Sequence, residues 1–368
     1  MGNEWHKIFN VNEGNFIDLA LEIFQFQYQD NPIYGTYVNT LRFNPKKINK
    51  LADIPFLPIR FFKSHHVKTT DFEPGYEFES SGTTQTGNSY HFVKDIEIYS
   101  RSFTTAFELF YGPVEEWCIV GLLPSYLERK PASPVSGGQS LWRRNAGRNS
   151  SLVFMVDELI RKSRHEQSGF YLDEYETLHK TLKDLEERKQ KTLLIGVTFA
   201  LLDFATEYSF PLRHTIVMET GGMKGRREEL VRDEVHEILK RKFQLEVIHS
   251  EYGMTELLSQ AYSKGNGIFY CPPWMKVLIR DEEDPLTVQG SEFSVQSQEF
   301  TVQNLAVDSQ LPTHHSQRGV INIIDLANIY SCSFIATDDA GKLYDDGGFE
   351  VIGRVDNSDI RGCSLMAI

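Results

Sequence analysis

A short polar stretch, residues 79–87, carries the side chains best suited to chemistry. It reads Glu-Ser-Ser-Gly-Thr-Thr-Gln-Thr-Gly and places five hydroxyl groups and two glycines within nine residues. Glycine lets the backbone turn several N–H groups toward one point, and the hydroxyl groups add further donors there. Phosphate is the ligand that such donors suit. The alternative is a polar hairpin tip before the expected strand Tyr90–Val93, since the glycine spacing matches neither common nucleotide-binding loop.

A second polar stretch, residues 251–256, reads Glu-Tyr-Gly-Met-Thr-Glu and follows a region in which strand and helix patterns alternate. The expected strands cover residues 192–197, 213–219 and 245–249, and the expected helices cover residues 199–208 and 227–243. Such alternation predicts parallel βαβ units, whose ligands bind outside the carboxyl ends of the strands. The glycines Gly221 and Gly222 and the second stretch both fall at these ends, so we expect a ligand site there.

Composition narrows the classes of ligand and compartment. The chain has 368 residues, 40% of them hydrophobic and 12% aromatic, which is enough for one large domain or two modest ones. Its net charge of −13, without a long basic run, argues against nucleic acid or an anionic membrane as the main partner. The four cysteines form no Cys-x-x-Cys pair, which argues against a metal or redox site and suits the reducing cytoplasm. We expect neither a signal peptide nor a membrane-spanning segment.

The pattern changes after the second stretch. Short strands are expected over residues 319–325, 330–337 and 349–352, with Gly/Asp turns at residues 338–341 and 345–348. These elements predict a β-rich subdomain over about residues 260–352. Two polar segments interrupt the regular patterns: residues 133–149 are expected to form a loop, and residues 290–317 give a weak hairpin signal.

Together, and in this order, the two polar stretches resemble the Ser-Ser-Gly-Thr-Thr-Gly and Tyr-Gly-x-Thr-Glu motifs of the acyl-adenylate-forming superfamily. The resemblance implies an α/β fold, in which a large adenylate-forming domain of parallel sheets flanked by helices carries the small β-rich subdomain. Residues 1–352 would form the adenylate-forming domain, and residues 353–368 would hold a hinge motif and a short tail. The cofactors that the resemblance implies are ATP and Mg²⁺.

The resemblance also implies roles for single residues. Glu256 would ligate the magnesium ion, Thr255 would bond the α-phosphate, and Tyr252 would stack on adenine. Asp338 lies in a segment similar to the superfamily's Arg-Thr-Gly-Asp-Leu motif and would bond the ribose hydroxyl groups. The residues implied to hold the ATP phosphates are Ser80, Ser81, Gly82, Thr83, Thr84 and Gly87.

Two further segments carry implied contacts with the nucleotide. Gly221 and Gly222 resemble the Gly-Gly turn that lets adenine approach the backbone. Residues 353–356, Gly-Arg-Val-Asp, are similar to the superfamily's hinge motif, in which Arg354 would bond the ribose or a phosphate. The alternative at each implied position is a purely structural role, such as aromatic packing, a helix-terminal carboxylate, a turn or an exposed ion pair.

Two departures from the superfamily pattern matter. The phosphate loop of the superfamily commonly ends in lysine, whereas Asn88 follows the loop here. The cation on the leaving phosphates would then be Lys63, Lys224 or Arg226, or magnesium alone. The sequence also stops at Ile368, so we expect the usual C-terminal lid domain, with its catalytic lysine, to be absent.

With this short tail, the chain resembles the acyl-protein synthetase family, the fatty-acid–protein ligases of the bacterial bioluminescence reductase system. The resemblance runs over nearly the full length and includes residues 124–129 and 221–224. In that family the acyl group passes from acyl-AMP to a cysteine near the C-terminus, and Cys363 matches in position. Arg361 would favour the thiolate, which is the form that attacks a mixed anhydride. The alternative is a tail cysteine without a role.

The expected function is an AMP-forming acid–thiol ligase that activates a long-chain fatty acid, or another carboxylic acid, as acyl-AMP. The acyl group would pass to Cys363 and then to an acyl-accepting reductase partner. Two alternatives remain open. An AMP-forming acyl-CoA ligase is disfavoured by the expected absence of the lid domain. A nucleotide-binding or scaffold protein with the same fold and reduced catalysis is favoured by the missing loop lysine.

Overall fold

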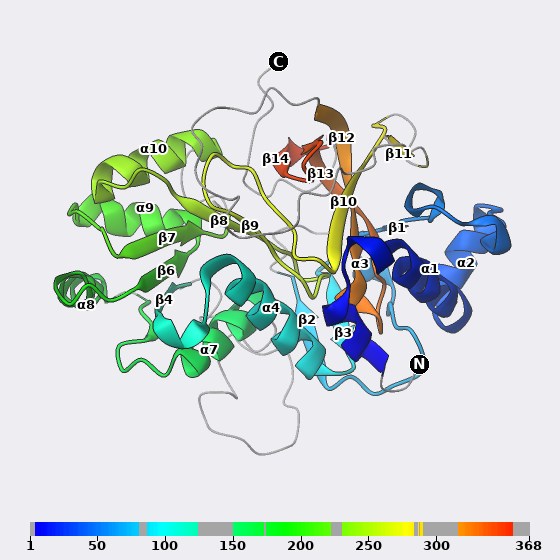
Figure 1. Cartoon of the computed structure of the whole chain (residues 1–368), viewed down its shortest axis with the longest axis horizontal. Coiled ribbons are helices and arrows are strands. Elements are labelled where there is room, and N and C mark those ends of the chain that lie inside the picture. The colour runs from blue at the N-terminus through cyan, green and yellow to red at the C-terminus, as the bar shows by residue number, and fades with distance from the viewer. Residues whose placement is uncertain are drawn as a thin grey trace.

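The computed structural model describes residues 4–80, 87–123, 150–172, 174–221, 230–282, 286, 288–289 and 316–355. Several positions singled out from the sequence lie outside these ranges: Ser81, Gly82, Thr83, Thr84, Gly222, Cys363 and the segment 133–149. The described residues form two six-stranded sheets, a separate two-stranded hairpin and flanking helices (Figure 1). The predicted α/β fold class is therefore confirmed.

The first sheet holds five parallel strands and one antiparallel edge strand. Its order is β5 (Gly169–Phe170), β4 (Cys118–Leu122), β6 (Thr192–Gly196), β7 (Thr215–Glu219), β8 (His249–Tyr252) and the antiparallel β9 (Ala261–Ser263). Every residue of β4 and β6 is buried, as expected for parallel strands that are covered on both faces. The predicted parallel βαβ units are confirmed, although β8 begins later than the expected strand at residues 245–249.

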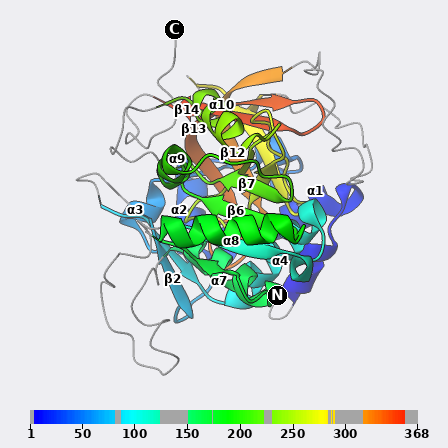
Figure 2. The same cartoon turned by 90° about the vertical axis from the view of Figure 1, so that its left-hand side faces the viewer.

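Five longer helices accompany the first sheet. They are α4 (Ile96–Tyr111), α7 (Ser151–Ser163), α8 (Tyr175–Glu187), α9 (Thr198–Glu207) and α10 (Arg232–Phe243). Figure 1 shows α8, α9 and α10 on the side away from the second sheet, and Figure 2 shows α8 in front of the strands. The first turn of α10 is acidic and its last turn is basic, which complements the helix dipole.

The second sheet is mainly antiparallel. Its order is β1 (Leu57–Pro58), β13 (Phe334–Tyr344), β12 (Ser316–Asp325), β10 (Met275–Arg280) and β11 (Val288–Gln289), and β14 (Phe349–Arg354) also pairs with β13. The predicted turn at residues 345–348 is confirmed by the break between β13 and β14. The predicted turn at residues 338–341 is wrong, because these residues continue β13 as a strand. Contacts from distant segments hold this stretch extended, as the site shows below.

The N-terminal part of the chain packs beside the second sheet, on the right in Figure 1. Buried amides tie the two parts together, since Gln27 Nε2 donates to the Asn328 carbonyl at 3.1 Å and Asn31 Nδ2 donates to the Ser331 carbonyl at 2.9 Å. The elements of this part are α1 (Glu13–Asp30), α2 (Pro32–Thr40), α3 (Phe61–Ser64) and the hairpin of β2 (Tyr76–Glu79) with β3 (Tyr90–Val93). Short 3₁₀ helices are η1 (Glu4–Asn10), η2 (Pro45–Lys47), η3 (Leu51–Asp53), η4 (Val114–Glu116) and η6 (Leu326–Asn328).

A close backbone approach in the second sheet gives a stability test. Gly319 in β12 pairs with Gly341 in β13, and a Cβ atom at position 319 would lie 2.2 Å from the Arg280 carbonyl oxygen. Gly319→Ala should lower the free energy of unfolding by about 1–3 kcal/mol, because the backbone must shift. Gly169→Ala is the matched control, since a Cβ there meets nothing within 4 Å, and it should stay within about 0.5 kcal/mol. Equal effects of the two substitutions in urea unfolding would contradict this account.

Candidate active site

Tyr252, the last residue of β8, joins two residues of the second sheet. Its hydroxyl donates a 2.8 Å hydrogen bond to Oδ2 of Asp339 in β13. Nε of Arg354, the last residue of β14, lies 3.3 Å from Oδ1 of the same carboxylate. The structure therefore brings together three segments that are distant in sequence: the Tyr-Gly-x-Thr-Glu stretch, the segment around residue 338 and the hinge motif. We call Tyr252, Asp339 and Arg354 the trio.

The contacts within the trio are shielded from water. Tyr252 is 8% exposed, and its ring packs against Phe269 and Phe349 with centroids 5.8 and 5.5 Å away. Burial raises the pKa of Tyr252 well above its usual value, and the Asp339 carboxylate raises it further. The phenol therefore keeps its proton and acts as a donor. The buried Asp339 carboxylate needs such partners, because an unpaired charge away from water is costly.

Asp338 does not join the trio. Successive side chains of a strand point to opposite faces, so the side chain of Asp338 is directed away from Tyr252. Its Oδ2 lies 3.1 Å from Nε of Arg60. The implied role of Asp338 toward ribose stays a prediction, whereas Asp339 is the carboxylate beside Tyr252. The sequence motif favoured Asp338, and the expected turn over residues 338–341 gave no sign that the two aspartates would lie on opposite faces of a strand. The strand register, which pairs Asp339 with Arg354, identifies Asp339.

The two ends of the implied phosphate loop are tied together at its neck. The Ser80 N–H donates to the Ser89 carbonyl at 2.9 Å, and the Ser89 N–H donates to Ser80 Oγ at 2.8 Å. Asn88 Nδ2 donates to the Glu79 carboxylate at 2.5 Å. Gly87 has a φ of +86°, a left-handed conformation that costs glycine little. Ser80 and Gly87 thus define where the loop starts and ends, and its contacts with a phosphate stay a prediction.

The backbone of Thr255 and Glu256 is held from two directions. The Thr255 carbonyl oxygen lies 2.8 Å from Nδ1 of His91, and the Glu256 carbonyl oxygen accepts a 2.7 Å hydrogen bond from Asn328 Nδ2. Among the residues that the structure describes, no group of three or more His, Cys, Asp or Glu could hold a metal. The single carboxylate of Glu256 nevertheless suits Mg²⁺, which commonly binds one or two carboxylates together with substrate phosphates and water.

Glu219, the last residue of β7, supports the predicted Gly-Gly turn. Gly221 has a φ of +73°, and its N–H donates a 2.7 Å hydrogen bond to Glu219 Oε2. Arg232 Nε and His236 Nε2 lie 3.4 and 3.7 Å from Oε1 of Glu219. Burial would by itself raise the pKa of Glu219, but the contacts with His236 and Arg232 lower it to about 2. The ionised carboxylate is a fixed acceptor for the turn, a role that sequence reasoning missed.

Comparison with known families supplies the decisive match. A family model described as "Acyl-protein synthetase, LuxE" matches residues 9–367 of this chain. The chain belongs to the LuxE acyl-protein synthetase family. The match contains both polar stretches, both sheets and the position of Cys363, so the family expected from the sequence is confirmed. Among curated proteins, none matches this member of the family in a sequence search.

Solved structures with a similar fold share little sequence identity with this chain. A long-chain-fatty-acid-CoA ligase from Archaeoglobus fulgidus has 14% identity and a TM-score of 0.43, over 75% of this chain and 50% of its own. O-succinylbenzoate coenzyme A synthetase from Bacillus subtilis, in complex with AMP, has 15% identity and a TM-score of 0.41, over 80% and 64%. A luciferase-like enzyme from the mealworm Zophobas morio has 15% identity and a TM-score of 0.43, over 86% and 62%. The chain thus spans only 50–64% of the length of these proteins.

Within the described ranges, no helix combines the length and the apolarity needed to cross a membrane.

Glu251 directly precedes Tyr252 in β8 and lies among polar side chains that include Tyr99 and Tyr262. Burial raises the pKa of Glu251 to about 8, and the charge of Glu219 adds to the shift. Burial is the main cause that raises the pKa values of Tyr99 and Tyr262, and the charge of ionised Glu251 raises them further. Within the part of the chain that is described, the Tyr262 hydroxyl and Gln260 Oε1 have no hydrogen-bond partner. A ligand or water would satisfy these groups, since buried polar atoms are rarely left unpaired.

Glu251→Gln should stabilise this protein at alkaline pH. Glu251 ionises near pH 4.5 in the unfolded chain but near pH 8 in the folded one. The folded chain therefore holds this proton more tightly, and the free energy of unfolding falls as pH rises between these values. The variant lacks this loss and should gain at least about 1 kcal/mol at pH 8. Urea unfolding across this pH range measures the difference, with Glu246→Gln, at an exposed position, as the control. An unchanged pH dependence in Glu251→Gln would contradict the raised pKa.

Proposed function

We propose that this chain activates a carboxylic acid, in particular a long-chain fatty acid, as acyl-AMP and passes the acyl group through Cys363 to a reductase partner. The observation that supports this best is the meeting of Tyr252, Asp339 and Arg354, which come from three motif segments. Membership of the acyl-protein synthetase family, over a match that reaches residue 367, supports the same reaction.

The trio is suited to hold the nucleoside of ATP. A carboxylate accepts several hydrogen bonds, so Asp339 can receive both ribose hydroxyl groups while it keeps its bond from Tyr252. We assign the ribose contact to Asp339 because Tyr252 and Arg354 fix the orientation of its carboxylate. The ring of Tyr252 offers an aromatic face for adenine. The turn at Gly221 lets the base approach the backbone, since glycine has no side chain to block it.

The phosphates extend from the trio toward Thr255 and Glu256. The Thr255 hydroxyl donates to the α-phosphate, and the loop between Ser80 and Gly87 supplies N–H and hydroxyl donors to the other phosphates. Glu256 holds Mg²⁺, which when bound neutralises charge on the triphosphate and the leaving pyrophosphate.

The proposed reaction consists of three displacements. A carboxylate oxygen of the acid attacks the α-phosphorus of ATP, and the bond to pyrophosphate breaks. The protein contributes by holding the nucleotide and the acid in line, which removes much of the entropic cost of the attack, and by placing donors where charge develops. The Cys363 thiolate then attacks the acyl carbon, AMP leaves with the bonding electrons, and a thioester forms. A nucleophile of the reductase partner takes the acyl group from that thioester.

The other three cysteines are poorly suited to accept the acyl group. Burial raises the pKa of Cys118 to about 11 and that of Cys332 to about 12, and it also raises the pKa of Cys271. The thiolate is the nucleophilic form, so these thiols stay unreactive near neutral pH. Cys363, two residues after Arg361, is the fourth cysteine of the chain. We therefore assign the transfer to Cys363.

The purified chain should catalyse acid-dependent exchange between pyrophosphate and ATP, with long-chain fatty acids preferred in a panel of acids. Asp339→Asn should lower kcat/KM for ATP by about 10- to 100-fold, because a hydrogen bond to a charged group contributes about 1.5–3 kcal/mol. Asp338→Asn is the matched control and should stay close to wild type. A greater loss in Asp338→Asn would return the ribose contact to Asp338. Failure of every acid to support exchange would refute the ligase and favour a scaffold.

Labelled fatty acid and ATP should modify the chain through a thioester that hydroxylamine cleaves. Cys363→Ser should lose this label but keep pyrophosphate exchange, because activation precedes transfer. Cys271→Ser controls for loss of a half-buried thiol and should keep the label. A hydroxylamine-sensitive label that persists on Cys363→Ser would contradict the assignment of Cys363 as the acyl acceptor. Release of AMP that depends on coenzyme A and survives in Cys363→Ala would identify coenzyme A as the acceptor instead.

A further inference from the structure

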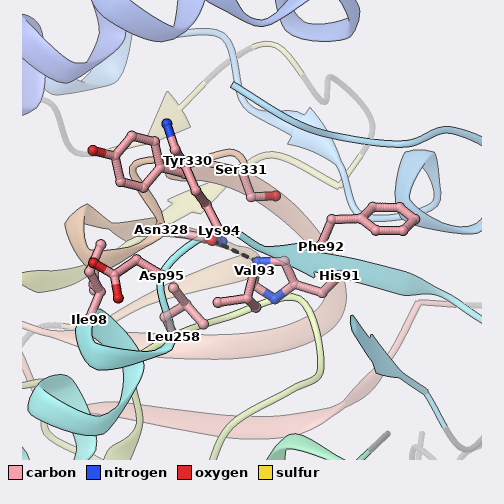
Figure 3. Close-up of a pocket in the computed structure, with 11 residues that line it drawn as sticks. His91, Phe92, Val93, Lys94, Asp95, Ile98, Leu258, Asn328, Tyr330 and Ser331 are labelled. Atoms are coloured by element: carbon pink, nitrogen blue, oxygen red, sulfur yellow. Dashed lines mark hydrogen bonds between the residues drawn. The ribbon is translucent and has the colours of Figure 1, made fainter. Parts of the chain in front are cut away.

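His91, in β3, lies where the two implied ATP-binding stretches meet. It is 1% exposed and follows the neck of the phosphate loop. Its Nδ1 lies 2.8 Å from the carbonyl oxygen of Thr255, and its Nε2 lies 2.9 Å from Oδ1 of Asn328. Figure 3 shows the ring directed at Asn328 in the wall of a small pocket. The imidazole therefore links the strand after the loop to the segment that carries Glu256.

Asn328, in η6, carries this link onward. Its Nδ2 donates a 2.7 Å hydrogen bond to the Glu256 carbonyl oxygen. Because the amide nitrogen is used there, the amide oxygen must be the atom that faces His91. The ring thus contacts the consecutive carbonyl groups of Thr255 and Glu256, one directly and the other through Asn328.

Both ring nitrogens of His91 face oxygen acceptors, although a neutral imidazole has a single N–H. Burial lowers the pKa of His91 to about 4, against the opposite effect of the contacts with Thr255 and Asn328. The ring is therefore neutral near pH 7 and donates to one of its two acceptors at a time. A substitution that removes the donor leaves both acceptors without it, while one that keeps an N–H can replace part of the contact.

The hairpin that carries His91 depends on side-chain contacts for its placement. Among the described residues, β2 and β3 form a sheet of their own that pairs with neither large sheet. Phe78 of β2 packs against Tyr99 and Phe154, with ring centroids 5.5 and 5.9 Å away, which anchors the hairpin to α4 and α7. Those ring contacts anchor β2 to α4 and α7, whereas the hydrogen bonds of His91 join β3 to Thr255 and Asn328.

We propose that His91 is a positioning residue for ATP, which sets the hairpin at the neck of the phosphate loop against the backbone of Thr255 and Glu256. The proposal rests on the proposed function, because it concerns the same nucleotide site. His91 reaches the two motifs through backbone carbonyl groups and Asn328, so it acts on the ligand only through them. Loss of His91 would leave the neck of the loop and the Glu256 carboxylate present but misaligned with respect to each other.

The test is direct binding of ATP with Mg²⁺ by calorimetry without acid, together with separate KM values for ATP and acid from pyrophosphate exchange. His91→Leu keeps the bulk of the ring but removes its donor. It should raise the Kd and the KM for ATP by about tenfold or more, as is typical of groups that orient a ligand's direct contacts. The KM for the acid should be unchanged. His91→Gln keeps an N–H and should recover part of the affinity for ATP.

Ser331→Ala is the matched control. Ser331 lines the same pocket, is buried, and donates from Oγ to the Val67 carbonyl at 3.0 Å, away from both motifs. It should lower stability without a change in ATP affinity. If His91→Leu binds ATP as wild type does, or Ser331→Ala weakens ATP binding equally, the role of His91 is overturned. If the wild-type chain itself neither binds ATP nor exchanges pyrophosphate, the proposed function fails first, and the role of His91 fails with it.

Discussion

The arrangement of the site depends on one buried charge, the carboxylate of Asp339. Such a charge is stable away from water only when it is paired, and the partners are Tyr252 and Arg354. Because Tyr252 belongs to the first sheet and the other two residues to the second, this requirement fixes where the two sheets meet. Backbone hydrogen bonds between Phe269 and Phe349, at 2.7 and 2.9 Å, reinforce the same junction.

Topology explains why the polar side chains gather at this junction. Parallel strands present their carboxyl ends at one edge of a sheet, so Glu219, which ends β7 and pairs with Ser250, and Tyr252, which ends β8, both lie at that edge. Each of these strand ends is followed by a segment that the proposed function assigns to ATP: the turn at Gly221 and the stretch through Glu256. The hairpin that carries the phosphate loop is not held near this edge by strand order, because it forms a separate sheet. Side chains such as His91 supply the connection.

Local sequence patterns were sufficient for the regular elements of the first sheet. The helix expected at residues 199–208 is α9, and the strand expected at residues 192–197 is β6, because burial on both faces and helical periodicity leave clear local signals. The turn expected at residues 338–341 failed for an equally physical reason. Aspartate favours turns when its carboxylate must find local partners, but here distant side chains satisfy both carboxylates and β13 stays extended.

The family and the identity of its motifs follow from residue types and their order along the chain, which no folding step can alter. What the chain could not reveal before folding is which of two adjacent aspartates faces Tyr252, since a strand turns successive side chains to opposite faces. The supporting roles of Glu219, His91 and Asn328 were hidden for the same reason. Each acts on a segment through contacts that form after distant parts of the chain pack together, and such contacts leave no local pattern to read.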